Sequence, residues 1–120
     1  MKEETFHQLI GLEIQKTETG PIIKLPLKPS HLNSGGSVHG GVHATLLDVA
    51  MGQTILFYGQ YKRLLTLEMQ VHYVKAVNSG LLWAKGEIIH KNRSSILTES
   101  RVFTEDNELV AHGTGTFYYK

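Results

Sequence analysis

Residues 33–58 read NSGGSVHGGVHATLLDVAMGQTILFY, a glycine-rich polar segment that leads directly into an apolar one. In the apolar part, Val42, Leu46 and Val49 recur at helical spacing, and further apolar side chains widen this stripe until it covers nearly the whole helix surface. The spacing predicts one helix over residues 40–58 that is buried at the centre of the fold. Asp48 is its only Asp, Glu, Lys or Arg.

The sequence on both sides of this helix alternates between apolar and polar residues, which is typical of half-buried strands. Before the helix, Gly20-Pro21 predicts a hairpin turn, and residues 5–10 predict a short amphipathic helix. After it, Gly59 suits a helix end, and short turns join the later strands. One apolar helix wrapped by a curved antiparallel sheet satisfies this order, so the predicted class is α+β. The strands are expected at residues 12–17, 22–28, 65–73, 81–90, 96–104 and 109–119.

Length and composition restrict the classes of function. The 120 residues predict a single domain over residues 1–120, and its small core makes association with further copies a reasonable expectation. The balance of 12 Lys and Arg against 11 Asp and Glu, without a basic cluster, argues against a nucleic-acid partner. The absence of cysteine excludes disulfides, thiolate zinc sites and cysteine nucleophiles.

No export or membrane segment is expected. Met1-Lys2-Glu3-Glu4 is too acidic and too polar for the start of a signal peptide. Residues 41–59 are long enough to suggest a membrane span, but Asp48 at mid-bilayer would cost roughly 2.5–3.5 kcal/mol. A buried helix in a cytoplasmic protein is therefore the expected interpretation.

Glycines at the start of the predicted helix suggest a binding site for a carbonyl oxygen. The first amides of a helix have no acceptor within the helix and carry the positive end of its dipole. Gly40 and Gly41 have no Cβ, so a ligand can approach their backbone closely. One such amide could donate to a developing oxyanion, an interaction worth roughly 3–4 kcal/mol in enzymes. The alternative is that the two glycines only form a tight turn into the helix.

Asp48 is the second chemical feature of this segment. Aspartate is a poor residue for a helix interior, and its neighbours Leu47 and Val49 are apolar. A carboxylate in such surroundings is a candidate general base or nucleophile. The alternative is a structural aspartate that caps a neighbouring loop.

Helix geometry separates these two features. Gly40 and Asp48 are eight residues apart, which places them about 12 Å apart along the helix axis at ~1.5 Å per residue. A carbonyl held by the glycine amide needs its attacking group within about 3–3.5 Å. If both residues are catalytic, two copies of the helix must therefore meet. A symmetric dimer with two shared sites is the natural solution.

Other polar residues near the helix start allow several roles. His39 and His43 are four residues apart and could bind zinc, but no third ligand has recognisable spacing, so His39 is interpreted as orienting a ligand or holding the loop. Asn33 can donate and accept hydrogen bonds, and could anchor either the loop or a substrate. Ser34 and Ser37 lack the Gly-x-Ser-x-Gly elbow of a serine nucleophile.

The string Asn33-x5-His39-Gly40-Gly41-x6-Asp48 resembles the signature of hotdog-fold acyl-CoA thioesterases of the phenylacetate-degradation (PaaI-like) group. The match continues through residues 42–52, and segments 66–73 and 109–117 also resemble that family, so the resemblance covers nearly the whole chain. It implies a hotdog fold, hydrolysis of acyl-CoA thioesters, and dimers that commonly pair into tetramers. We expect no metal and no cofactor.

The resemblance also implies catalytic roles. Asp48 would be the general base or nucleophile, and the Gly40 amide would polarise the thioester carbonyl from the opposite subunit. Asn33 and His39 would help to hold the thioester and orient water. Thr66 would supply a hydroxyl that assists the water.

Substrate contacts follow from the same resemblance. Arg93 and Ser94 fall where the family commonly contacts the pantetheine or nucleotide of CoA, and Gly41 would contact the substrate beside the catalytic amide. The turn reads Lys91-Asn92-Arg93 here, whereas the family usually has Gly-Arg at this place. Aromatic residues that could line an acyl pocket, or pack in the core instead, are Phe57, Tyr58, Tyr61 and Trp83.

Two other functions remain open for such a fold. A hotdog dehydratase of 3-hydroxyacyl thioesters would use a His–Asp pair such as His39 and Asp48, but the Gly-His-Phe-Pro-Gly loop typical of acyl-carrier-protein dehydratases is absent. A non-catalytic acyl-CoA-binding protein would use the same fold without the chemistry. Release of free thiol from a CoA ester distinguishes a thioesterase from both.

Overall fold

The computed structural model describes residues 4–120, so the expectation of no signal peptide rests on residues that lie mostly outside the described part of the chain. The described helices and strands follow the predicted order closely, and the long helix has the predicted bounds. The elements are α1 (Phe6–Ile10), β1 (Glu13–Thr17), β2 (Gly20–Pro26), the 3-10 turn η1 (Pro29–His31), α2 (Gly40–Tyr58), β3 (Leu64–Tyr73), β4 (Leu81–Lys91), β5 (Ser95–Thr104) and β6 (Leu109–Tyr119).

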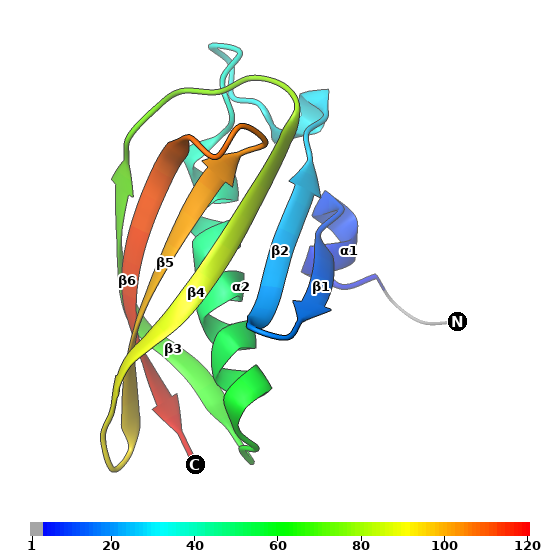
Figure 1. Cartoon of the computed structure of the whole chain (residues 1–120). Helices are drawn as coiled ribbons and strands as arrows, with labels where there is room; N and C mark the ends of the chain where they lie inside the picture. The colour runs from blue at the N-terminus through cyan, green and yellow to red at the C-terminus, as the bar shows by residue number, and fades with distance from the viewer. Residues whose placement is uncertain (1–3) are drawn as a thin grey trace.

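The strands form one antiparallel six-stranded sheet in the order β1-β2-β4-β5-β6-β3, and this sheet curves around α2 (Figure 1). The α+β class and the wrapped central helix are therefore confirmed. The expected short turn between the strands now called β3 and β4 is wrong, because β3 pairs with β6 and residues 74–80 cross the end of the sheet. An alternating pattern locates strands along the chain but does not say which strands are neighbours.

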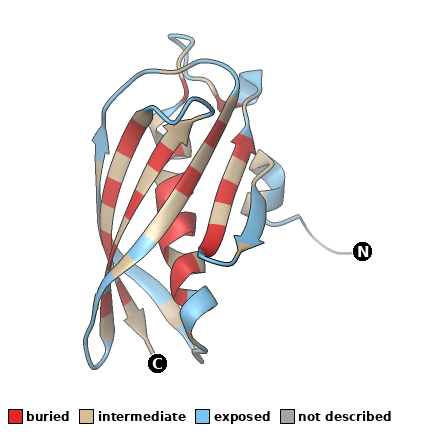
Figure 2. Ribbon diagram, viewed as in Figure 1, coloured by how far each residue is buried: buried red, intermediate tan, exposed pale blue. Residues whose placement is uncertain are grey.

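Buried residues recur along β2, β4, β5 and β6 and along α2 (Figure 2). Leu46, Leu47 and Ala50 of α2 belong to the larger core cluster, and Met51 and Ile55 belong to a smaller one nearer the helix end. The apolar surface of α2 is thus used for packing inside the fold. Within residues 4–120, no helix combines the length and apolar character needed to cross a membrane.

Two glycines differ from their predicted roles. Gly20 and Pro21 pair with β1 as the first residues of β2, so the hairpin turn lies one to two residues earlier than expected. Gly20 has φ +118°, a backbone conformation that glycine adopts without strain. Gly59 follows the helix end in an extended conformation rather than a left-handed one. A Cβ at this position would lie 2.7 Å from the Tyr61 hydroxyl oxygen, so the tyrosine side chain would have to shift.

β3 contains a bulge that changes which side chains face α2. The register with β6 shifts between Thr66 and Glu68, which leaves Leu67 as the extra residue, 60 % exposed. After the bulge, Met69 packs in the core with other odd-numbered residues; before it, the even-numbered Leu64 does so. A bulge reverses the alternation in this way because one inserted residue moves every later side chain to the opposite face. The bulge therefore turns Thr66 toward α2.

β4 passes so close to α2 that the contact requires glycine. A Cβ on Gly86 would lie 2.5 Å from the Ala50 carbonyl oxygen and 2.8 Å from the Thr54 hydroxyl oxygen. We expect Gly86→Ala to lower the free energy of unfolding by about 1–3 kcal/mol through overpacking, measured by urea denaturation. Gly35→Ala adds the same methyl group in an exposed loop, with its nearest contact at 3.4 Å. Equal losses in the two variants would contradict this explanation.

Candidate active site

The start of α2 presents one free amide and one that is already bonded. His39 is the N-cap residue, and its Nδ1 accepts a hydrogen bond from the Gly41 amide at 2.8 Å. The imidazole must therefore lack a proton on Nδ1 in this conformation. The Gly40 amide has no acceptor within residues 4–120, so it can donate to a ligand. His39 thus caps the helix, and the Gly41 amide is engaged in that cap.

Asn33 organises the loop that leads to this helix start. Its side-chain oxygen accepts hydrogen bonds from the Gly35 amide at 2.9 Å and the Ser37 amide at 3.1 Å. Its backbone amide also donates to the Ser37 carbonyl at 2.7 Å. Asn33 therefore anchors the loop through its oxygen, while its side-chain NH₂ group has no acceptor within residues 4–120.

Asp48 lies half-buried on α2, beside the bulge of β3. The Thr66 hydroxyl donates to Asp48 Oδ1 at 2.8 Å, and the other carboxylate oxygen has no partner among the described residues. The carboxylate therefore does not cap a neighbouring loop, which was the structural alternative. The structure brings Thr66 and Asp48 together, as the resemblance implied.

Tyr73 was not predicted to lie at the site. Its hydroxyl donates to the Gly40 carbonyl oxygen at 3.1 Å, and a Cβ on Gly40 would lie 3.1 Å from the hydroxyl oxygen and 3.2–3.4 Å from the ring carbons. The side chain is 58 % exposed, so it remains accessible. It forms one wall of the space in front of the first turn of α2, which we call the helix mouth. The sequence predicted a strand over residues 65–73, and only the fold shows that this strand ends beside Gly40.

Arg93 and Ser94 lie apart from these groups within one chain. They are in the turn between β4 and β5, at the end of the sheet opposite the start of α2 (Figure 1). Ser94 accepts a hydrogen bond from the Tyr119 amide through its backbone carbonyl at 3.2 Å. The structure of the single chain therefore assembles Asn33, His39 and Gly40 at the helix mouth, and Asp48 with Thr66 further along α2.

The two histidines near the helix start do not form a metal site. His39 is exposed and borders a cavity beside α1, whereas His43 is buried and borders a different cavity beside Tyr73. No group of three or more His, Asp or Glu side chains within residues 4–120 is arranged to hold a metal ion. Zinc chemistry has no support in this geometry.

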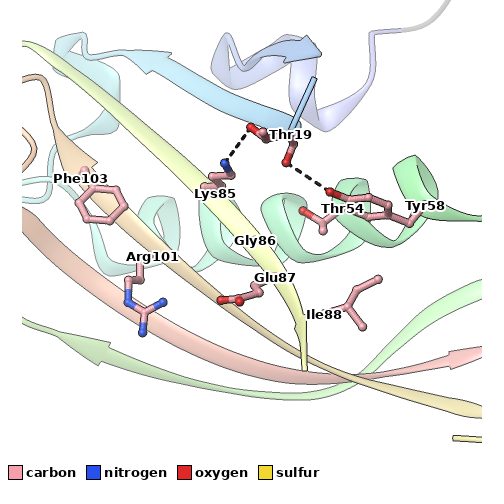
Figure 3. Close-up of a pocket in the computed structure, with 9 residues that line it drawn as sticks. All are labelled: Thr19, Thr54, Tyr58, Lys85, Gly86, Glu87, Ile88, Arg101 and Phe103. Atoms are coloured by element: carbon pink, nitrogen blue, oxygen red, sulfur yellow. Dashed lines mark hydrogen bonds between the residues drawn. The ribbon is translucent and has the colours of Figure 1, made fainter. Parts of the chain in front are cut away.

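A cavity of about 610 Å³ is lined by none of the predicted catalytic or substrate-binding residues (Figure 3). It lies where β4 runs past the end of its pairing with β2, and Thr54 and Tyr58 border it from the later turns of α2. The Tyr58 hydroxyl donates to the Thr19 carbonyl at 3.3 Å across it. Of the other aromatic candidates, Trp83 stacks on Phe103 at 4.6 Å between ring centres. These contacts do not connect the aromatic residues to Gly40.

A comparison of this sequence with protein-family models identifies a known family. The chain belongs to the Thioesterase superfamily, whose family model matches residues 35–111. That match includes Gly40, Asp48 and Thr66, together with strands β3, β4 and β5 and the first residues of β6. The hotdog fold implied by the resemblance is confirmed.

Individual relatives agree with this assignment. A Bacillus halodurans protein, solved with CoA, is 35% identical, has a TM-score of 0.90, and is matched over 100% of this chain and 82% of that chain. A variant of the phenylacetic acid degradation protein PaaI from Thermus thermophilus shares the fold, with 23% identity, a TM-score of 0.83, and coverage of 94% and 96%. A Saccharolobus solfataricus protein named "Putative esterase" is 21% identical over 118 residues, covering 98% of this chain and 84% of the relative. Family and relatives together support a hydrolase.

Proposed function

We propose that this protein hydrolyses acyl-CoA thioesters to a free acid and CoA. The observation that supports this most directly is the pair of unsatisfied groups on α2: the Gly40 amide, which has no acceptor, and the Asp48 carboxylate, which is held only by Thr66 within residues 4–120. The amide suits a developing oxyanion and the carboxylate suits the activation of water. The CoA bound to the Bacillus halodurans relative indicates the thiol half of the substrate.

These two groups act together only if two chains share them. They are about 12 Å apart along one helix at ~1.5 Å per residue. β3 is an edge strand of the sheet, and its exposed residues include the apolar Leu65 and Leu67. A long exposed edge of this kind favours pairing with a second copy. We therefore propose a two-fold dimer joined along β3, in which the helix mouth of each protomer faces Asp48 of the other.

The proposed reaction follows from these positions. The thioester carbonyl oxygen accepts a hydrogen bond from the Gly40 amide, and Asn33 and His39 help to hold the thioester. Asp48 acts either as a general base that takes a proton from water or as a nucleophile whose acyl adduct water then cleaves. Thr66 orients the carboxylate. In both routes the C–S bond breaks, CoA leaves as the thiolate, which is a good leaving group, and the acid is released.

The remaining parts of the proposal concern binding and assembly. Arg93 and Ser94 of one protomer would contact the CoA arm bound at the other, because antiparallel pairing of β3 brings opposite ends of the two chains together. Gly41 would contribute through the cap that it forms with His39. We also propose that two dimers pair into a tetramer. Residues 1–120 form one domain in this proposal, and the protein is cytoplasmic.

Release of CoA thiol from butyryl-CoA and phenylacetyl-CoA tests this function. We expect thiol release to rise linearly with enzyme concentration, followed with a thiol-reactive dye. A dehydratase would instead interconvert 3-hydroxybutyryl-CoA and crotonyl-CoA without releasing thiol. A non-catalytic binder would bind the esters by calorimetry and leave them intact. Either of these two results would contradict the proposed hydrolysis.

A further inference from the structure

A cavity of about 280 Å³ lies between α1 and the first turns of α2, and we call it the α1 cavity. Its walls include His39 and Gly41, the two residues adjacent to Gly40. Since consecutive Cα atoms are about 3.8 Å apart, the free Gly40 amide lies at the edge of this cavity. A group attached to a carbonyl bound at that amide can therefore enter the α1 cavity.

A second cavity, about 330 Å³, lies on the other side of α2. Gly40 and His43 border this second cavity, whereas Gly41, Val42 and Thr45 border the α1 cavity. At 3.6 residues per turn, these two sets of positions point in opposite directions from the helix axis. The two substituents of a carbonyl held at the helix mouth also point away from each other. One cavity is therefore available to the acyl group, and the other to the sulfur and the pantetheine arm.

The lining of the α1 cavity is mostly apolar and carries the side chains of Phe6, Ile10, Leu32 and Val42. Two of its polar atoms already have partners, because the Thr45 hydroxyl donates to the Gly41 carbonyl at 2.8 Å and His39 Nδ1 accepts from the Gly41 amide. Among the described residues, no Lys, Arg, Asp or Glu lines it. A charged group would find no partner there, so the cavity suits an uncharged, apolar ligand.

The cavity on the other side of α2 offers hydrogen bonds instead. Asn33 and Ser37 border it, and the side-chain NH₂ group of Asn33 has no acceptor within residues 4–120. The pantetheine arm of CoA contains amide groups whose carbonyl oxygens accept hydrogen bonds, so Asn33 can donate to one of them. This assigns the pantetheine arm to the second cavity and leaves the α1 cavity for the acyl group.

Phe6 presents uncovered apolar surface at the α1 cavity. Its side chain is 58 % exposed, and none of the residues of α1, which are all described, is buried. The helix is nevertheless held in place by the buried His31, whose Nδ1 accepts from the Lys28 amide and whose Nε2 therefore donates to the Ile10 carbonyl at 2.7 Å. A phenyl ring that is positioned beside a cavity but contributes little to the core is explained if a ligand covers it.

We infer that the α1 cavity binds the acyl group of the substrate, that this acyl group is uncharged and apolar, and that Phe6 contacts it. This inference rests on the proposed function, since it assigns the substrate class of the same site. Phe6 acts here as a specificity residue through burial of the acyl group, and the bond-breaking steps do not require it.

A series of ligands tests the chemistry of the cavity. Titration calorimetry in the Asp48→Asn background would compare free CoA with acetyl-, propionyl-, butyryl- and succinyl-CoA. From acetyl- to butyryl-CoA we expect the affinity to rise about fourfold for each added methylene, the usual gain for burying one. Succinyl-CoA has the same chain length as butyryl-CoA but ends in a carboxylate, and should bind at least about tenfold more weakly than butyryl-CoA.

Phe6→Ala in the same background tests the contact itself. It should weaken binding of butyryl-CoA about fivefold, because part of the apolar wall is lost, and leave the affinity for free CoA unchanged. Leu9→Ala is the matched control, since Leu9 lies on the same helix, is 60 % exposed and does not line the cavity. It should change neither affinity. The ligand series decides the chemistry of the cavity even if a variant fails to fold.

Three results would overturn the inference. The first is an affinity that does not rise with chain length, or succinyl-CoA binding as tightly as butyryl-CoA. The second is an equal effect of Phe6→Ala on free CoA and butyryl-CoA, whether both are weakened or neither. The third is the same loss in Leu9→Ala as in Phe6→Ala.

Thiol release by the unmodified protein is read separately from these affinities. A preference for apolar acyl groups without thiol release would refute the proposed hydrolysis and leave the acyl site standing. Thiol release from esters that show no such preference would refute the acyl site and leave the hydrolysis standing.

Discussion

Asp48→Asn is expected to reduce kcat for thioester hydrolysis by roughly 10²–10⁴-fold, the usual range for loss of a catalytic base. Asparagine keeps an oxygen that can accept the Thr66 hydroxyl bond now made at 2.8 Å, so the local packing is preserved. It removes the negative charge and with it the ability to take a proton or form an acyl adduct. Steady-state thiol release, with the melting temperature measured in parallel, checks both parts of the expectation.

Asp106→Asn is the matched control for this variant. It makes the same atomic change at an exposed carboxylate in the turn between β5 and β6, and should leave kcat and the melting temperature unchanged. Full activity in Asp48→Asn would remove Asp48 from the reaction. A large fall in melting temperature would indicate that the carboxylate is needed for folding instead.

Gly40→Pro is expected to reduce kcat by roughly 10²–10³-fold, because proline removes the amide that would stabilise the oxyanion. Proline is well tolerated at the first position of a helix. The preceding residue, His39, has φ −60° and ψ 137°, a conformation that proline permits for its neighbour. The substitution therefore deletes one hydrogen-bond donor with little change to the backbone, and kcat is again measured by thiol release.

Gly40→Ala separates loss of the donor from crowding. Both substitutions place a Cβ 3.1 Å from the Tyr73 hydroxyl oxygen, but alanine retains the amide. We expect alanine to lower kcat by much less than proline, since the exposed Tyr73 ring can move. Similar losses in the two variants would mean that contact with Tyr73, rather than the amide, explains the effect.

Mixing the two inactive variants tests whether one site draws on two chains. In a dimer of one Asp48→Asn chain and one Gly40→Pro chain, one site receives an intact amide and an intact carboxylate, and the other receives neither. Random reassociation of equal amounts should therefore restore about a quarter of the wild-type activity. Activity that stays at the level of the separate variants would place both groups of each site in the same chain.

Much of the fold could be predicted because helices and strands leave recognisable patterns among neighbouring residues. The apolar surface around Leu46 and Val49 required a buried helix, and its observed bounds, Gly40–Tyr58, agree with the prediction. The strands were found for the same reason, since alternation is a property of neighbouring residues. The pairing of β3 with β6 was missed because it depends on contacts between residues far apart in the chain.

Some residues of the candidate site could be predicted from the sequence and others could not, because only some of them are unusual among their sequence neighbours. Gly40 and Asp48 stand out because a glycine pair at a helix start and an aspartate inside an apolar helix are locally unusual. Tyr73 does not stand out, since a tyrosine in a strand is ordinary in sequence. Its relevance comes from the end of β3 meeting the first turn of α2, where Tyr73 contacts Gly40.

The extra residue in β3 matters for anyone who aligns this chain with distant homologues. Because the register shifts at Leu67, an alignment without a gap there would equate inward-facing positions with outward-facing ones on one side of it. A homologue without the insertion could then seem to lack the hydroxyl that contacts the carboxylate, while carrying it one column away. Inventories of residues at the Thr66 position across this superfamily should therefore be built from superposed backbones.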